Sequence, residues 1–375
     1  MLRLENLLYL ILLTLLVPAH PATWQAAPSQ KRESDYYKAQ VEQLEHFLDR
    51  ELERADGERE KRWHRVYSSI EKYKASVRPN RRRLAETIGG ALPLKNPFQA
   101  RRIPLEETGT YQIERVWLPT LEGVETYGIL LIPKRTAPTR LPALICVHGM
   151  GSSPEKVCGM AEEDYTRRFG ARAAERGYVV FAVLMTNDVA TKSRLDRKAI
   201  LLGSRLQGLE QAKLFRTIDF LETLREVDPK TIGIYGISWG GRTAMYTAAI
   251  DERIAATVIS GHFNETLPKM VAPSPHYTAF IETAEDYAFF PGLAREFSDS
   301  DVASLIAPRP VFIEQGTADR VVYYPMAQGE FERLKRIYER LGVGDRAQFG
   351  LFEGGHVVHG EAAFAFLDKW LKRPR

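Results

Sequence analysis

This chain of 375 residues has few cysteines, little excess charge and no apolar run long enough to span a membrane. Its two cysteines, Cys146 and Cys158, cannot form the disulfide framework of a small secreted domain. The 52 basic and 48 acidic residues leave a formal net charge of +4, which gives no reason to expect a nucleic-acid partner. The sequence lacks a metal-ligand cluster, a phosphate-binding loop and a dinucleotide fingerprint, so we expect no metal and no cofactor.

The amino-terminal residues have the layout of a signal peptide. An early arginine precedes an apolar block from Leu7 to Val17, and Pro18 follows among small residues. The block is shorter than the roughly 20 apolar residues that cross a bilayer, so no stable membrane span is expected. Cleavage after Ala19 would remove residues 1–19, and an uncleaved amphipathic anchor is the alternative. We therefore expect a secreted or periplasmic protein.

Residues 20–90 are expected to form a helical extension. From about 31 to 83 the chain is dense in charge, and apolar side chains recur at helical spacing in two stretches. The pattern predicts two amphipathic helices without the sustained heptads of a coiled coil. They are expected to dock on the main domain or on a second subunit, which would give a homo-oligomer. The two stripes are Tyr37, Val41, Leu44, Leu48 and Leu52, and Trp63, Val66, Tyr67, Ile70 and Tyr73.

Residues 91–375 have the pattern of a single α/β domain. Short apolar runs of strand length alternate with helix-like segments, which predicts a doubly wound, mostly parallel sheet with right-handed crossovers. The first two runs, joined by "TLEG", read as an antiparallel hairpin. Cys146 lies inside one of the apolar runs and is expected to be a small core residue. The predicted strands are 111–118, 124–132, 141–149, 178–185, 232–237, 254–260, 309–316 and 347–355. Helices are predicted at about 207–226, from the end of the strand at 232–237 to residue 250, at about 325–342, and from about residue 360 onward.

Two long connections interrupt this alternation, at residues 186–206 and 261–307. Connections of this length in a compact domain are usually functional. Both leave the carboxyl ends of strands, which is the edge where open α/β sheets bind ligands. We therefore expect them to form the walls of a substrate pocket, with residues 261–307 as a small cap.

The motif most informative about chemistry is "GISWGG". Gly236, Ser238 and Gly240 form G-x-S-x-G between a predicted strand and a predicted helix, as a nucleophile elbow requires. A serine hydroxyl is a weak nucleophile unless a base takes its proton, so the motif alone leaves open a small residue in a strand-to-helix turn. Partners elsewhere in the chain are needed to decide between these readings.

An acid and a histidine occur downstream in the required order. Asp319 follows the predicted strand at 309–316, and His356 follows the last predicted strand. His356 would shuttle the proton, and Asp319 would fix its tautomer and stabilise the imidazolium. Glu265 is the alternative acid and His359 the alternative base. We therefore predict Ser238, Asp319 and His356 as a catalytic triad.

The loop "VHGMGSS" at 147–153 is expected to complete the site. Gly149 and Gly151 allow its backbone to approach the nucleophile, so Met150 can offer an N–H to a developing oxyanion. Trp239, at the start of the following helix, is expected to supply the other N–H. His148 is expected to hold the loop through a structural hydrogen bond.

These residues together resemble the α/β-hydrolase superfamily, and within it the dienelactone-hydrolase-like and acetyl xylan esterase-like exported hydrolases of bacteria. The resemblance covers about residues 90–372 and rests on "VDPKTIGIYGISWGG", "IAPRP" ahead of the acid, and "FEGGHVVHGEAAFAFLDKWL". It implies ester hydrolysis through an acyl-enzyme without a cofactor, with Ser238, Asp319 and His356 as the triad. Dienelactone hydrolases proper have a cysteine nucleophile, and many relatives have "HGGG" where this chain has "HGMG".

The expected substrate is a small-molecule or saccharide ester. Trp239, Tyr287 and Phe289 are candidates for stacking on sugar rings, which favours acetyl or aryl esters of carbohydrates, although core packing is the alternative role. Two other functions stay open at this stage. One is a serine peptidase of the prolyl oligopeptidase type, whose large propeller domain does not fit the short amino-terminal region. The other is a non-catalytic binding protein that retains the fold.

Overall fold

The computed structural model describes residues 28–134 and 139–372. The described residues fall into two compact units, one ending at Glu51 and the other beginning at Leu52. The expected signal peptide, residues 1–19, lies outside the described residues. Within the described ranges, no helix is both long and apolar enough to cross a bilayer.

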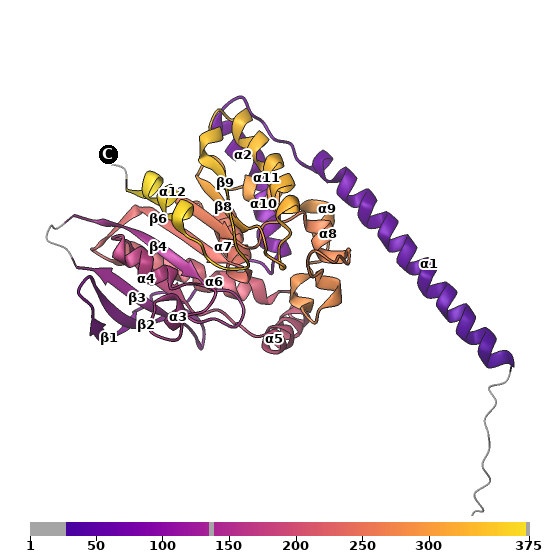
Figure 1. Cartoon of the computed structure of the whole chain (residues 1–375), viewed down its shortest axis with the longest axis horizontal. Helices are drawn as coiled ribbons and strands as arrows, with labels where there is room; N and C mark the ends of the chain where they lie inside the picture. The colour runs from indigo at the N-terminus through magenta and orange to yellow at the C-terminus, as the bar shows by residue number, and fades with distance from the viewer. Residues whose placement is uncertain (1–27, 135–138, 373–375) are drawn as a thin grey trace, which may run out of the picture. The chain divides into compact units, whose positions relative to one another are not determined.

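The second unit contains one mixed sheet of nine strands in the described residues, in the order β1-β2-β3-β5-β4-β6-β7-β8-β9 (Figure 1). Pairing is antiparallel from β1 to β5 and parallel from β5 through β4 to β9. This confirms the expected mostly parallel α/β-hydrolase sheet. The strands are β1 Arg101–Glu107, β2 Tyr111–Leu121, β3 Val124–Pro133, β4 Leu141–Val147, β5 Val179–Val183, β6 Val227–Ile237, β7 Ala256–Ser260, β8 Val311–Gly316 and β9 Ala347–Phe352.

Helices cover both faces of the sheet, and each face has its own apolar core. Ile145 and Val147 of β4 point into the core under α2, α6, α7 and α11, while Leu144 and Cys146 point into the core under α3, α4 and α12. The side chains alternate because successive strand residues face opposite ways, and Cys146 is buried as expected. The helices are α1 Pro28–Glu58, α2 Ile70–Thr87, α3 Pro154–Val157, α4 Phe169–Glu175, α5 Val189–Leu201, α6 Leu206–Thr223, α7 Trp239–Ile250, α8 Thr266–Val271, α9 Leu293–Glu296, α10 Asp299–Ser304, α11 Tyr324–Arg340 and α12 Glu361–Leu371, with short 3-10 turns η1 Arg59–Arg62, η2 Phe280–Glu282, η3 Asp286–Ala288 and η4 Gly344–Arg346.

Strand β1 was not predicted from the sequence. Its residues, "RRIPLEE", are almost all exposed, because it is an edge strand that pairs only with β2. Charged residues and a proline are typical of edges that must not pair with another chain. A strand of this kind has no apolar alternation to reveal it.

Helix α1 lies where the first amino-terminal helix was predicted. The second prediction was wrong for residues 63–69: α2 begins at Ile70, and Trp63 and Tyr67 pack on the core from a non-helical segment, because apolar spacing reports burial and not the helix itself. Ser69 caps α2 by accepting from the N–H of Lys72, and Tyr73, Val77 and Leu84 of α2 are buried in the core over the sheet. The hydroxyl of Tyr73 donates to the carbonyl of Ser304 over 2.9 Å. Residues 52–90 therefore belong to the same compact unit as the sheet.

The first unit contains most of α1 and exposes an apolar stripe. Tyr37, Leu44 and Leu48 are each more than half exposed to solvent. An oligomer formed through this stripe stays a prediction.

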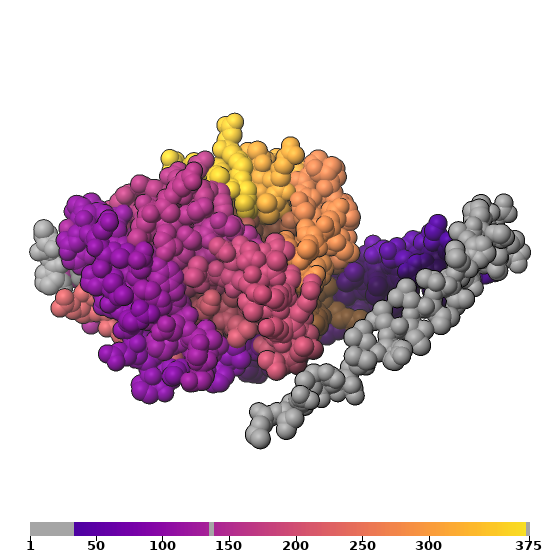
Figure 2. Space-filling model, turned by 90° about the horizontal axis from the view of Figure 1, so that it is seen from below, coloured from indigo at the N-terminus to yellow at the C-terminus, as the bar shows by residue number. Residues whose placement is uncertain are grey.

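The two long connections are folded rather than extended. Residues 186–206 contain α5, and residues 261–307 contain α8, η2, η3, α9 and α10. They meet where Ser193 donates to the carbonyl of Ala284 over 2.9 Å and Arg197 pairs with Asp286 at 2.6 Å. Figure 2 shows their pink and orange surfaces side by side. The cap and the first connection thus form one continuous part of the surface.

Candidate active site

The turn between β6 and α7 holds Ser238 in a rare backbone conformation. Its φ of 58° and ψ of −126° lie outside the regions that residues with a side chain normally adopt. Such strain persists only where the surrounding structure enforces it, and it clusters at functional sites. The conformation is the one expected of a nucleophile elbow.

The two glycines of G-x-S-x-G are required by close backbone packing. A Cβ on Gly240 would lie 2.2 Å from the carbonyl oxygen of Val147, and a Cβ on Gly236 would lie 2.0 Å from the carbonyl oxygen of Gly240. Neither contact can relax by moving a flexible side chain, because both partners are backbone. The glycines therefore let α7 start directly against β4 and β6.

Asp319 and His356 form a hydrogen-bonded pair at the ends of β8 and β9. Nδ1 of His356 lies 2.8 Å from Oδ2 of Asp319. Because an ionised carboxylate only accepts, Nδ1 carries the proton and Nε2 is free to accept one.

Further donors hold the acid in place. The N–H groups of Val321 and Val322 donate to the other oxygen of Asp319 over 2.7 and 3.1 Å. Burial alone would raise the pKa of Asp319, but its hydrogen bond to His356, the charge of that ring and the two N–H groups bring the pKa below its usual value. Asp319 is therefore a carboxylate at neutral pH.

The end of β7 brings the serine and the histidine to one place. The N–H of Ser238 donates to the carbonyl of Ser260 over 2.8 Å. A Cβ on the next residue, Gly261, would lie 2.9 Å from Cε1 of His356 and 3.6 Å from Oδ2 of Asp319. Gly261 thus lies against the histidine and the acid, one residue from the carbonyl that holds the serine. The structure brings the three predicted triad residues together at the carboxyl edge of the sheet.

The "HGMG" loop lies against the nucleophile. A Cβ on Gly149 would be 2.8 Å from Cβ of Ser238 and 2.8 Å from the hydroxyl of Tyr165. That hydroxyl donates to the carbonyl of Met150 over 2.8 Å. In the part of the chain that the structure describes, the N–H groups of Met150 and Trp239 have no acceptor. Both N–H groups, predicted as oxyanion donors, are therefore unpaired within the described residues, and their role stays a prediction.

His148 has the structural role expected from the sequence. Its Nδ1 lies 2.8 Å from the carbonyl oxygen of Gly149, and its Nε2 accepts from the N–H of Met185 over 3.1 Å. Burial lowers the pKa of His148 to about 4, so the ring is neutral at physiological pH. It ties the loop to the end of β5.

The alternative acid and base face other partners. The Glu265 carboxylate lies beside Gly329 of α11, where a Cβ would be 3.2 Å from its Oε1. His359 stacks on Phe352 with ring centroids 4.9 Å apart. In the described residues neither contacts Asp319 or His356, so the geometry favours the original pair.

The aromatic residues of the cap pack around Trp239. Trp239 is 7% exposed and meets Tyr287 and Phe280 edge to face, with centroids 4.8 and 6.4 Å apart. Tyr287 is buried, and Phe289 is partly buried against the same cluster. Nζ of Lys192, which pairs with Glu210 at 2.9 Å, lies 5.0 Å from the Trp239 ring. Their predicted role in substrate binding stays a prediction, and most of this aromatic surface is packed against protein.

Sequence reasoning missed two charged residues that support the site. Glu314 of β8 accepts from the hydroxyls of Tyr235 and Ser260, over 2.6 and 2.8 Å, and from the N–H of Gly360 over 2.7 Å. Lys269 of the cap donates to the carbonyl of Val321 over 2.7 Å. A charged residue inside the apolar run "VFIEQG" was the available signal for Glu314.

Comparison with known proteins identifies the family and several relatives. The model of the dienelactone hydrolase family matches residues 128–329. The chain is 26% identical over 314 residues to YtaP of Bacillus subtilis (strain 168), named as a hydrolase, which covers 79% of this chain and 100% of that protein. It is 27% identical over 150 residues to carbohydrate esterase MZ0003 of an unknown prokaryotic organism, which covers 34% of this chain and 31% of that protein.

Solved structures share the fold. A glucuronoyl esterase from Solibacter usitatus has a TM-score of 0.63 at 15% identity, covering 82% of this chain and 94% of that one. An acetyl xylan esterase from Paenibacillus sp. R4 has a TM-score of 0.53 at 18% identity, covering 82% and 98%.

Proposed function

This chain belongs to the dienelactone hydrolase family of α/β-hydrolases, and we propose that it is a serine hydrolase that cleaves carboxylic esters through an acyl-enzyme. The observation that carries the proposal is the strained backbone of Ser238 beside the His356–Asp319 hydrogen bond. The three residues also follow one another in the chain order of this fold.

The contacts suggest a mechanism with named roles. Nε2 of His356 takes the proton from the hydroxyl of Ser238 as its oxygen attacks the ester carbonyl carbon. The N–H groups of Trp239 and Met150 stabilise the negative charge on the carbonyl oxygen. His356 then donates the proton to the leaving alcohol, and Asp319 stabilises the imidazolium in between. Water, deprotonated by the same histidine, then attacks the acyl carbon; the bond to Oγ of Ser238 breaks, and His356 returns the proton to that oxygen, which releases the acid.

A serine mechanism is proposed although dienelactone hydrolases proper use a cysteine. Ser238 occupies the nucleophile position of the motif, and both cysteines lie in the core. Burial raises the pKa of the Cys146 and Cys158 thiols well above the usual value, which opposes thiolate formation. Neither cysteine can replace Ser238 as nucleophile.

The proposed substrates are acetyl or aryl esters on carbohydrates. Support comes from the carbohydrate esterase among the relatives. The proposed location is secreted or periplasmic, supported by the signal-peptide pattern of residues 1–19. Mass spectrometry of the mature amino terminus tests export, because an intact Met1 would contradict cleavage. Acetylated and feruloylated saccharides assayed in parallel test the substrate class.

A fluorophosphonate probe tests the reaction class directly. The wild-type protein should be labelled and should hydrolyse p-nitrophenyl acetate, whereas Ser238→Ala should do neither. His356→Ala should lose activity, while His359→Ala, the matched control on the same loop, should retain most of it. If the wild type neither labels nor hydrolyses any ester of the panel, the proposed function is wrong; if only His359→Ala is inactive, the base is His359.

A further inference from the structure

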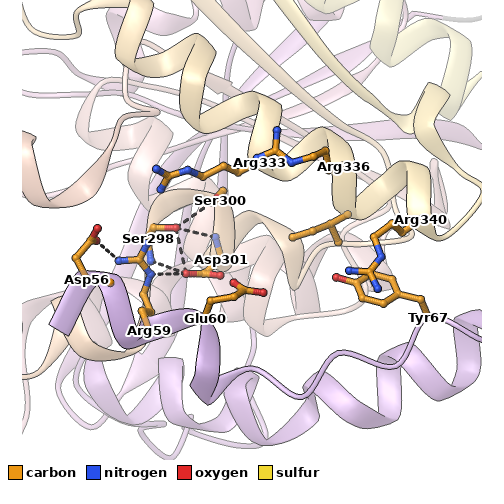
Figure 3. Close-up of a pocket in the computed structure, with 12 residues that line it drawn as sticks. Asp56, Arg59, Glu60, Tyr67, Ser298, Ser300, Asp301, Arg333, Arg336 and Arg340 are labelled. Atoms are coloured by element: carbon orange, nitrogen blue, oxygen red, sulfur yellow. Dashed lines mark hydrogen bonds and ion pairs between the residues drawn. The ribbon is translucent and has the colours of Figure 1, made fainter. Parts of the chain in front are cut away.

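A cavity lies away from the predicted catalytic residues. It has a volume of ≈ 490 Å³ and lies between the end of α1, η1, α10 and α11 (Figure 3). The volume falls within the range of small-ligand sites. None of the triad or oxyanion residues lines it.

One wall of the cavity is a row of guanidinium groups. Arg333, Arg336 and Arg340 occupy positions i, i+3 and i+7 of α11, so their side chains leave the same face of the helix. Figure 3 shows them along one side of the cavity. Like charges at this spacing destabilise a helix by a few tenths of a kcal/mol per pair unless an anion compensates them.

The described residues offer these arginines little compensation. Arg336 has no hydrogen-bond or ion-pair partner in residues 28–134 or 139–372. The guanidinium carbon of Arg340 lies over the ring of Tyr67, 3.6 Å from its centroid. Arg333 lies 3.3 Å from Oε2 of Glu330, whose other oxygen accepts from the N–H of Ser300 over 2.7 Å.

The acidic residues on the opposite wall already have partners. Arg59 bonds to Asp301 over 2.8 Å and also to Asp56. Arg65 pairs with Asp301 at 2.5 Å and with Glu60 at 2.9 Å. Figure 3 shows the bonds of Arg59 in this network below the α11 arginines. These acids are neutralised locally, so the positive charge of α11 is left facing the cavity.

We propose that this cavity is a binding site for an oxyanion group, namely a phosphate, a sulfate or a carboxylate. The guanidinium fork matches such groups because it donates two parallel hydrogen bonds to two oxygens. Arg336 and Arg333 are the principal donors, and Arg340 is fixed by Tyr67 at the far end of the row. The site is independent of the proposed ester hydrolysis.

Isothermal titration of the full chain tests the site. Sodium phosphate, sodium sulfate and sodium galacturonate are titrated separately, with ionic strength held constant by sodium chloride. Arg336→Ala should weaken binding of the bound anion tenfold or more, since it removes charge-assisted hydrogen bonds to the anion. Arg336→Lys, which keeps the charge and loses the fork, should weaken it less. Arg82→Ala removes an exposed helical arginine outside the cavity and should leave binding unchanged.

The three anions separate the sources of the oxyanion. Saturable binding of phosphate or sulfate alone identifies a tetrahedral oxyanion, and tighter binding of galacturonate identifies the carboxylate of an acidic sugar. Circular dichroism and thermal melting show that each variant is folded, and Arg336 has no partner whose loss would unfold the protein. The proposal is overturned if none of the three anions binds saturably, or if Arg336→Ala binds as the wild type does.

Discussion

Replacing Ser238 by glycine should make the protein more stable than replacing it by alanine. Both variants lack the hydroxyl, so both lose the nucleophile and should be inactive. They differ in that glycine adopts a φ of 58° with a ψ of −126° freely, whereas alanine keeps the strain. The difference in unfolding free energy between the two variants therefore measures the strain stored at the nucleophile.

The expected size follows from three opposing contributions. A residue held in a sparsely populated region stores about 1–3 kcal/mol, and this ψ lies outside even the left-handed helical region, which favours the upper end. Glycine lowers the unfolding free energy by about 0.4–1 kcal/mol relative to alanine, because its unfolded chain has more conformational freedom. Loss of the Cβ, which lies near Gly149, costs at most about 0.8 kcal/mol. Ser238→Gly should thus be about 1 kcal/mol more stable than Ser238→Ala.

Urea unfolding followed by tryptophan fluorescence measures this difference. Arg168 supplies the matched control, because its φ of 49° and ψ of 35° lie inside the left-handed helical region. The gain from Arg168→Ala to Arg168→Gly should be close to zero, since the strain there is smaller. If Ser238→Gly is no more stable than Ser238→Ala, the turn stores no strain, and the argument that its conformation is enforced for function fails.

Two further substitutions test the packing and the charge of the site. Gly240→Ala should lower the unfolding free energy by about 3 kcal/mol or more, because its Cβ would lie 2.2 Å from a backbone oxygen. The control is Gly57→Ala on α1, where a Cβ would meet no atom, and this variant should be neutral or stabilising. Equal urea midpoints for the two variants would contradict the prediction. Asp319→Asn should reduce kcat roughly 10³–10⁴-fold. Since the folded pKa of Asp319 is lowered, its contribution to stability is complete above the unfolded pKa of about 3.9 and is lost as pH falls through the folded pKa. Acid titrations of wild type and Asp319→Asn should converge below pH 4, and a constant gap would refute the assignment.

Most of the fold could be predicted because its strands are buried on both faces. β4 and β5 are fully apolar runs. β1 could not be predicted, because its side chains lie in solvent and satisfy no packing requirement. The limit was therefore physical: an edge strand is specified by its partner, β2, rather than by its own residues.

The candidate site could be predicted where chemistry fixes both residue type and chain order. Gly236, Ser238 and Gly240 are set by close backbone packing, and Asp319 and His356 by the need for an acid and a base on neighbouring strands. Choosing His356 over His359 from sequence rested on position alone. In the structure, His356 contacts Asp319, whereas His359 stacks on Phe352.

The residues that hold the site in place, such as Glu314, could not be predicted. Such a residue needs only a hydrogen-bond partner in the fold, and many residue types can make such a bond. The Glu314 carboxylate joins Tyr235, Ser260 and Gly360, which lie 79, 54 and 46 positions away in the chain. It therefore links β6, which leads to the nucleophile, and β7 to the loop that follows His356. An unpaired carboxylate at this depth would cost several kcal/mol, so the three donors and the acid must be present together. Removing any one donor should disturb the spacing of nucleophile and base without touching either, because the catalytic geometry depends on buried bonds between elements far apart in sequence.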